Sequence, residues 1–183
     1  LRVLTYGALA ELNLNGLVAF SDAMDALNSS MATFWDDIHP QLDEDDGDAT
    51  MRFNTLQMLN DHELVTESLM RAPLVTMKGV GSFSLRDIEL AEGKINPVGD
   101  EEVNDIALIR GAFSEASAEE MVALGEGVSA SLEHLKRMAE LWDELAPSEP
   151  AIDIDEAQRA MSDVDRKSTR LNSSHQIISY AVF

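Results

Sequence analysis

The spacing of large apolar residues, and the point where that spacing ends, constrains this chain most. From Phe20 to Ile38 such residues recur every three or four positions, which predicts one amphipathic helix with a single buried stripe. Pro40 blocks continuation of that helix. Residues 43–48 then read Asp-Glu-Asp-Asp-Gly-Asp, which predicts a solvated acidic loop before a second helix opens at residue 50 or 51.

Start and stop signals divide the rest of the chain into further helices. Residues 1–12 carry a buried-face pattern, and Gly16 separates them from the next helix, so the two are expected to form an antiparallel hairpin. The longest predicted helix runs from Ser117 to Leu145, and its two glycines, at 125 and 127, leave room for a bend or break. Four polar residues are placed to cap the first turn of a helix: Asp61, Ser84, Asp100 and Ser117.

One segment lacks helical spacing. Residues 75–82 contain Gly79 and Gly81, and we expect them to form an irregular or briefly extended connection. The predicted fold class is therefore all-α: an irregular multi-helix bundle with an acidic loop and this one short connection.

The charge balance excludes several classes of partner. The chain has 13 basic and 34 acidic residues, for a formal net charge of −21, whereas phosphate backbones and anionic membranes attract basic faces. The sequence has no cysteine, so disulfide and thiolate chemistry are excluded. No apolar run approaches the ~20 residues that span a bilayer. We therefore expect no nucleic-acid binding and no membrane insertion.

Candidate chemical sites in the sequence are weak. Placing Gly47 at the sixth position of an EF-hand loop puts Leu42 at the first ligand and Phe53 at the twelfth, where a glutamate is required. His39 lies near Asp36, but no second histidine is close in sequence. We find no nucleophile elbow or phosphate-binding loop. The prediction is no enzyme and no cofactor, with a calcium- or metal-responsive helical binding module as the alternative.

Several motifs, in order, resemble one protein family. Residues 34–43, with the acidic loop and helix that follow, resemble the signature of the ImpA N-terminal domain, which occurs in the TssA proteins of bacterial type VI secretion systems. Residues 1–4 and 16–20 resemble its opening helical pair, and residues 52–59 its R-x-N-x-L-x-x-L helix. Residues 72–75 and 83–88 resemble its PLV and FSLRD segments. The resemblance covers roughly residues 1–145.

This resemblance implies a structural role. The family suggests a cytoplasmic assembly protein that acts as a protein–protein adaptor at the secretion baseplate or sheath. The chain lacks the segment that precedes this point in the family and the C-terminal region that builds rings, so we expect an N-terminally truncated fragment whose full-length form makes homo-oligomers. The residues that carry the family signature are Trp35, His39, Pro40, Leu42, Asp46, Arg52, Asn54, Leu56, Pro73 and Leu74.

The signature residues also carry structural expectations. Trp35, Leu42 and Leu56 are predicted to be buried. Arg52 and Asn54 are predicted to bond the acidic loop and to fix it against the helix that follows.

The last residues differ in character from the acidic chain before them. Residues 165–183 resemble the translation of a common short-read sequencing adaptor, and we interpret them as adaptor-derived. The predicted organisation is thus an ImpA N-terminal-like helical domain over residues 1–146, a linker and the start of a further helix over residues 147–164, and the adaptor-derived tail.

Overall fold

A helical hairpin opens the fold. The computed structural model describes the backbone of residues 1–45 and 47–180 and the side chains up to Leu171. Helices α1 (Arg2–Asn15) and α2 (Leu17–Phe34) pack together, as predicted. Gly16 joins them at a φ of 83°, which a residue without a side chain adopts at little cost.

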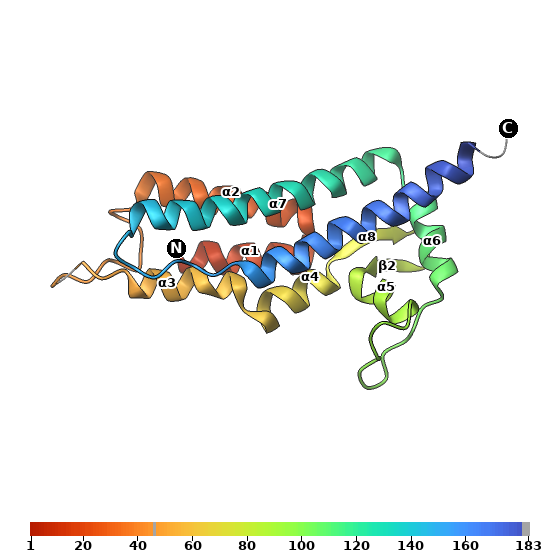
Figure 1. Cartoon of the computed structure of the whole chain (residues 1–183), viewed down its shortest axis with the longest axis horizontal. Helices are drawn as coiled ribbons and strands as arrows, with labels where there is room; N and C mark the ends of the chain where they lie inside the picture. Colours follow the sequence, from red (N-terminus) through yellow and green to blue (C-terminus); the bar gives the residue numbers. More distant parts are fainter. Residues whose placement is uncertain (46, 181–183) are drawn as a thin grey trace.

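Helix α7 (Ala118–Leu145) lies along α2 and forms the longest contact between helices (Figure 1). It continues without a break through both of its glycines. Gly127 is buried at the α2 contact, where an added Cβ would lie 3.2 Å from the Val18 Cα atom. The missing side chain therefore lets the two backbones approach closely. The predicted cap Ser117 begins this helix and forms a reciprocal capping box with Glu120.

A chain of short helices forms the opposite side of the bundle. Helix α3 (Thr50–Gln57) is followed by the 3-10 turn η1 (Met58–Asn60), the π-helical turn η2 (His62–Thr66) and helix α4 (Glu67–Arg71). The Asp61 carboxylate accepts a hydrogen bond from the Leu64 amide at 3.0 Å, so the predicted cap is confirmed.

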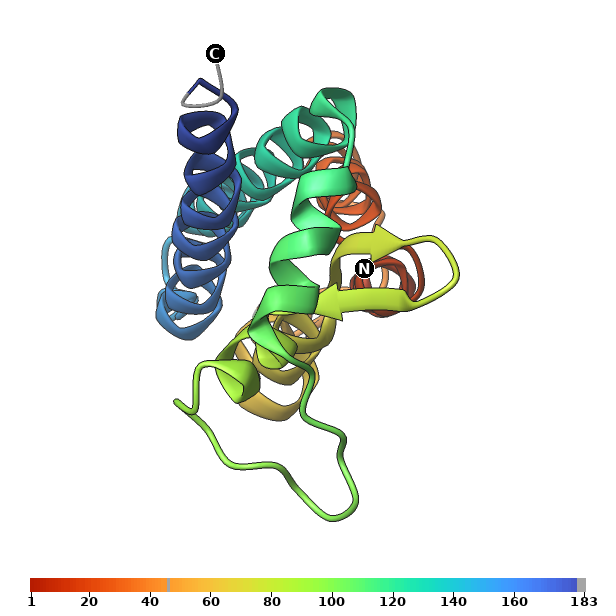
Figure 2. The same ribbon diagram turned by 90° about the vertical axis from the view of Figure 1, so that its right-hand side faces the viewer.

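Two short strands correct the all-α prediction. Strands β1 (Pro73–Met77) and β2 (Gly81–Ser84) pair antiparallel, with Val75 opposite Phe83, and they project beside α6 at one end of the molecule (Figure 2). The connection expected to be irregular or briefly extended is thus a small sheet, because Val75 and Phe83 bury their side chains while the two backbones satisfy each other. The fold is mostly helical but not purely so.

Helix α5 (Leu85–Ala91) begins at the predicted cap Ser84, which forms a reciprocal capping box with Asp87. The next helix starts later than predicted. Helix α6 (Ile106–Glu115) is capped by Asp105 and not by Asp100. Glu101 holds the preceding segment as a loop, because its carboxylate accepts from the Arg86 guanidinium at 2.6 and 2.7 Å.

Helix α8 (Asp155–Tyr180) packs along α7 and closes the bundle. It continues past residue 165, where the sequence changes character. Within this stretch Leu171 is buried, and Lys167 forms an ion pair with Glu89 of α5. No helix of the described residues has the length and hydropathy needed to cross a membrane.

The core is apolar with one large exception. Its largest fully buried side chains come from α1, α2 and α7 and from the shorter elements between α2 and α6: Trp142, Arg52, Phe20, Leu12, Met24, Leu27, Met31, Leu56, Leu59, Leu69, Leu85 and Ile88. Arg52 is the exception, since a guanidinium is rarely buried without partners. Its surroundings form the candidate site.

Candidate interaction site

Arg52 holds the chain segment that leaves α2. Its side chain is 0% exposed, and its three donor nitrogens point at three backbone carbonyls. Nη1 donates to Trp35 at 2.7 Å, Nη2 to Ile38 at 2.8 Å and Nε to Pro40 at 2.8 Å. The last carbonyls of a helix have no partner within it, and the rigid fork of arginine suits several acceptors at once. One side chain therefore fixes the end of α2 and the turn after it.

The charge of Arg52 is stabilised by an aromatic ring and by dipoles. Its guanidinium carbon lies 4.4 Å from the centre of the Trp35 ring, which is cation–π geometry. Burial lowers the pKa of Arg52, and the nearby charge of Asp36 acts in the opposite direction. Among the described residues no carboxylate forms an ion pair with Arg52. The carbonyl oxygens and the ring therefore supply the partners of the cation.

Three aromatic rings join the ends of α2, α3 and α7. Trp142 lies edge-on to Trp35, with ring centres 6.0 Å apart, and tilted against Phe53 at 5.8 Å. The Trp142 indole N–H donates to the Pro150 carbonyl at 2.9 Å, so a fully buried ring keeps its polar atom satisfied. This cluster ties the segment after α7 to the corner that Arg52 organises.

A shallow hollow of about 150 Å³ opens beside Trp35. Its walls come from three parts of the chain: the end of α2, the acidic loop, and the end of α7 with the turn that follows. The Ala49 amide donates to the Glu149 carboxylate at 3.0 Å and joins two of these parts. Its lining residues are Trp35, Leu42, Gly47, Ala49, Leu145, Ala146, Pro147, Ser148 and Glu149.

The burial predictions hold only in part. Leu56 is fully buried, as expected. Trp35 and Leu42 are partly buried instead, because each has one side against the core and the other on the hollow.

The predicted contacts with the acidic loop are not found among the described residues. Arg52 bonds carbonyls that precede the loop, since the unpaired carbonyls at the end of α2 lie within reach. Asn54 is exposed. The loop is held by its own bonds, among them the Asp43 amide donating to the Asp48 carbonyl at 3.0 Å.

The remaining signature residues lie at two ends of the molecule. His39 is exposed and Pro40 is partly buried, and both stand in the turn that Arg52 holds. Pro73 and Leu74 begin β1, far from that turn (Figure 1). Asp46 lies outside the described residues. The signature therefore marks the Arg52 corner and, separately, the start of the small sheet.

Within the described part of the chain, no three histidine, aspartate or glutamate side chains gather in a way that could hold a metal ion. His39 and its acidic neighbours are spread over an exposed turn, so the metal-responsive alternative gains no support.

Two members of the aromatic cluster, Trp142 and Phe53, are not among the site residues predicted from the sequence. Trp142 lies in the apolar stripe of α7, so the sequence does indicate that it is buried. The sequence gives no signal for its contacts with Trp35 and Phe53, because those residues stand about a hundred positions away.

Comparisons with known proteins agree with the resemblance in the sequence. Residues 1–61 match the family model described as ImpA, N-terminal, type VI secretion system. The chain is 29% identical over 135 residues to the type VI secretion system component TssA1 of Pseudomonas aeruginosa. That alignment covers 73% of this chain and 38% of the relative, so the chain spans well under half of that protein.

A solved structure shares the fold. It is the N-terminal domain, including the conserved ImpA_N region, of the TssA component of the type VI secretion system from Burkholderia cenocepacia. The two structures superpose with a TM-score of 0.78 at 22% sequence identity, covering 95% of this chain and 71% of the other. The predicted resemblance to the ImpA N-terminal family is confirmed.

Proposed function

We propose that this chain, similar to the ImpA N-terminal domains of TssA proteins, is part of a structural component of a type VI secretion system. The family match over residues 1–61 carries the proposal. That stretch contains α1, α2, the acidic loop and α3, and thus the whole of the segment organised by Arg52. Both relatives are named as secretion-system components, which supports an assembly role.

The proposed mechanism is that of an adaptor. The chain would bind baseplate or sheath proteins through a preformed surface, and a region beyond it would make the homo-oligomer. A rigid corner suits this role, because a surface that is already ordered loses little conformational entropy on binding. Catalysis forms no part of the proposal, and neither does a cofactor.

The domain division also stays a proposal. We assign residues 1–146 to the ImpA N-terminal-like domain, residues 147–164 to a linker with the start of a helix, and residues 165–183 to the adaptor-derived tail. Helix α8 begins within the second segment and crosses the boundary after residue 164, so the helix itself does not mark that boundary. Long-read sequencing of the source locus through the codon for Val164 tests the last boundary; a genomic reading frame that encodes residues 165–183 would refute it.

Co-purification with defined components tests the adaptor function. Purified baseplate and sheath proteins from the matching secretion locus are passed over the immobilised chain. We expect one of them to be retained in stoichiometric amount. Retention of none of them, by a chain whose circular dichroism shows the folded helical signal, would overturn the proposal. An unrelated acidic helical protein of similar net charge serves as the control for charge alone.

A further inference from the structure

Helix α1 carries an apolar stripe that the described residues leave uncovered. Val3 is 84% exposed and Leu14 is 78% exposed, and Gly7 and Ala10 between them are also exposed. These four positions are spaced by four, three and four residues, so they fall on one line along the helix. In Figure 2 this helix, drawn in red beside the N label, lies on the side of the molecule away from α8.

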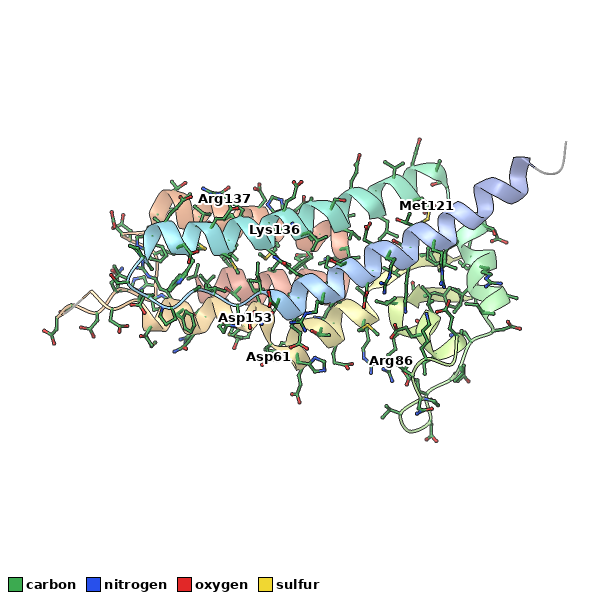
Figure 3. All side chains as sticks on the ribbon, viewed as in Figure 1. Asp61, Arg86, Met121, Lys136, Arg137 and Asp153 are labelled. Carbon is green, nitrogen blue, oxygen red and sulfur yellow. The ribbon has the colours of Figure 1, made fainter. Side chains whose placement is uncertain are left out.

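This α1 stripe has no charged residue, although the chain as a whole has a net charge of −21. The charged side chains of α1 are Arg2 and Glu11, and neither belongs to the stripe. Glu11 is half-buried and accepts a hydrogen bond from the side-chain amide of Asn15 in the same helix. The outward face of α7 differs, because Lys136 and Arg137 project from it among exposed glutamates (Figure 3). Two copies of such an acidic chain repel each other over most of their surface, but not at the stripe.

The order of side-chain sizes along the α1 stripe is the same in both directions. The two outer positions, Val3 and Leu14, are large, and the two inner positions, Gly7 and Ala10, are small. If a second α1 packs antiparallel about a two-fold axis between residues 8 and 9, Val3 lies opposite Leu14 of the second copy and Gly7 opposite its Ala10. The small residues then let the two helices approach closely where they cross, and the large ones pack at both ends. A two-fold contact needs this kind of self-complementary surface.

A hollow of about 280 Å³ adjoins the Val3 end of the stripe. Its surface is mainly apolar, and it lies between the start of α1, the turn that Arg52 holds and the first turn of α3. In the antiparallel arrangement Leu14 of the second copy reaches Val3 and therefore meets the border of this hollow. The residues that line it are Leu1, Arg2, Val3, His39, Pro40 and Met51.

We propose that α1 forms an interface between two copies of this chain, which pack their stripes antiparallel about a two-fold axis. Exposed apolar residues that gather on one face mark interaction surfaces, and two strongly acidic chains meet with least repulsion where neither carries a carboxylate. A single helix of 14 residues offers less than the roughly 800 Å² per partner of a standard interface, so this dimer is weak. The contact goes beyond the proposed function, because it needs no secretion protein and no region outside this chain.

Sedimentation velocity of the chain over a series of concentrations tests the contact. We expect a monomer–dimer equilibrium with a dissociation constant of roughly 10–300 μM. Raising the salt concentration from about 20 to about 300 mM should lower that constant at least about twofold, because salt screens the repulsion between the two acidic chains. A monomer at every concentration up to about 1 mM would overturn the proposal, and so would a dimer that salt weakens.

A pair of matched variants locates the interface. Ala10→Glu places a carboxylate at the centre of the stripe in both copies, and should raise the dissociation constant at least about tenfold. Ala123→Glu makes the same change at an exposed position of α7 and should leave the constant within about twofold. Circular dichroism checks that both variants keep the helical fold. Equal weakening by the two variants would assign the effect to net charge and would overturn the proposal.

The register of the two helices can be measured directly, because the sequence has no cysteine and a single introduced thiol is unique. Position 3 faces position 14 of the second copy in the proposed arrangement. A mixture of the Val3→Cys and Leu14→Cys variants should therefore form disulfide-linked dimers at least about fivefold faster than either variant alone. Faster linking of Val3→Cys with itself would indicate a parallel contact and would overturn the antiparallel interface.

This inference and the adaptor function fail separately. A dimer that Ala10→Glu dissociates and Ala123→Glu does not supports the interface, whether or not a secretion protein is retained on the immobilised chain. If the chain stays monomeric and Ala10→Glu abolishes retention of a secretion protein, the stripe binds that protein and not a second copy. That result would overturn the interface and leave the adaptor function standing.

Discussion

Replacing Arg52 with methionine tests the central feature of the fold. Methionine keeps much of the apolar stem and removes the guanidinium, so the carbonyls of Trp35, Ile38 and Pro40 lose their donor. Arg52→Met should therefore lower the free energy of unfolding and loosen the turn after α2.

The magnitude follows from opposing contributions. Each of three hydrogen bonds to a charged donor contributes about 1.5–3 kcal/mol net, and the contact with the Trp35 ring about 0.5–2 kcal/mol. Burying a cation costs several kcal/mol, which offsets part of this gain. We expect a net loss of roughly 2–4 kcal/mol. For a chain of this size that corresponds to a fall in Tm of roughly 4–16 °C.

Two assays report the result. Urea unfolding followed by far-ultraviolet circular dichroism gives the global free energy without relying on the tryptophans beside the mutation. Limited proteolysis with a glutamate-specific protease reports the acidic loop, where cleavage after Glu44 should accelerate. Arg110→Met, at an exposed position of α6, is the matched control and should change stability by less than about 0.5 kcal/mol.

An unchanged or higher urea midpoint for Arg52→Met would refute the reasoning. It would mean that the hydrogen bonds only balance the cost of burying the charge. If the midpoint fell while proteolysis at Glu44 stayed the same, the loss would lie in the core and not in the turn.

Three further predictions concern other parts of the fold. Gly127→Ala should lose about 1–3 kcal/mol by crowding Val18, whereas Gly125→Ala, with open space around it, should gain up to about 1 kcal/mol; chemical denaturation of both variants checks the pair. Ser117→Ala should cost about 1 kcal/mol and lower the Tm, because the cap of α7 is lost. The Glu101 carboxyl has its pKa lowered from 4.5 to about 2, so its stabilising effect is present above pH 4.5 and is lost as the pH falls through 2. Glu101→Gln should make the acid-side decline in urea midpoint shallower, and an unchanged slope would contradict the assignment.

Local signals in the sequence found the helices because their partners are local. The caps at Asp61, Ser84 and Ser117 each bond an amide three residues away, and the stripe of α2 needs only its own spacing. The prediction that Asp100 caps a helix is wrong, because local sequence suits Asp105 equally well as the cap, and Asp105 is the residue that caps α6. The choice between them depends on the bond between Glu101 and Arg86, fifteen residues earlier.

The resemblance in the sequence identified the residues of the Arg52 corner but not what they do. Arg52 was expected to bond the acidic loop, yet its acceptors lie twelve to seventeen residues earlier in the chain. Trp35 and Leu42 read as core residues, and only their position beside the end of α7 leaves one side of each open. Periodicity reports that a face is apolar, but it does not report how completely a neighbour covers that face.

The sequence by itself determined which segments are helical, three of the four predicted helix caps, the acidic surface, and the turn at Pro40, because these depend on dihedral preferences, local hydrogen bonds and charge. Only the tertiary structure decided the two-stranded sheet, the burial of Arg52 and the hollow beside Trp35. Each of these needs backbone or side chains from distant segments, as when the Ala49 amide meets Glu149 a hundred residues later. Such contacts form because the packed helices place those groups together, and no spacing within one segment encodes them.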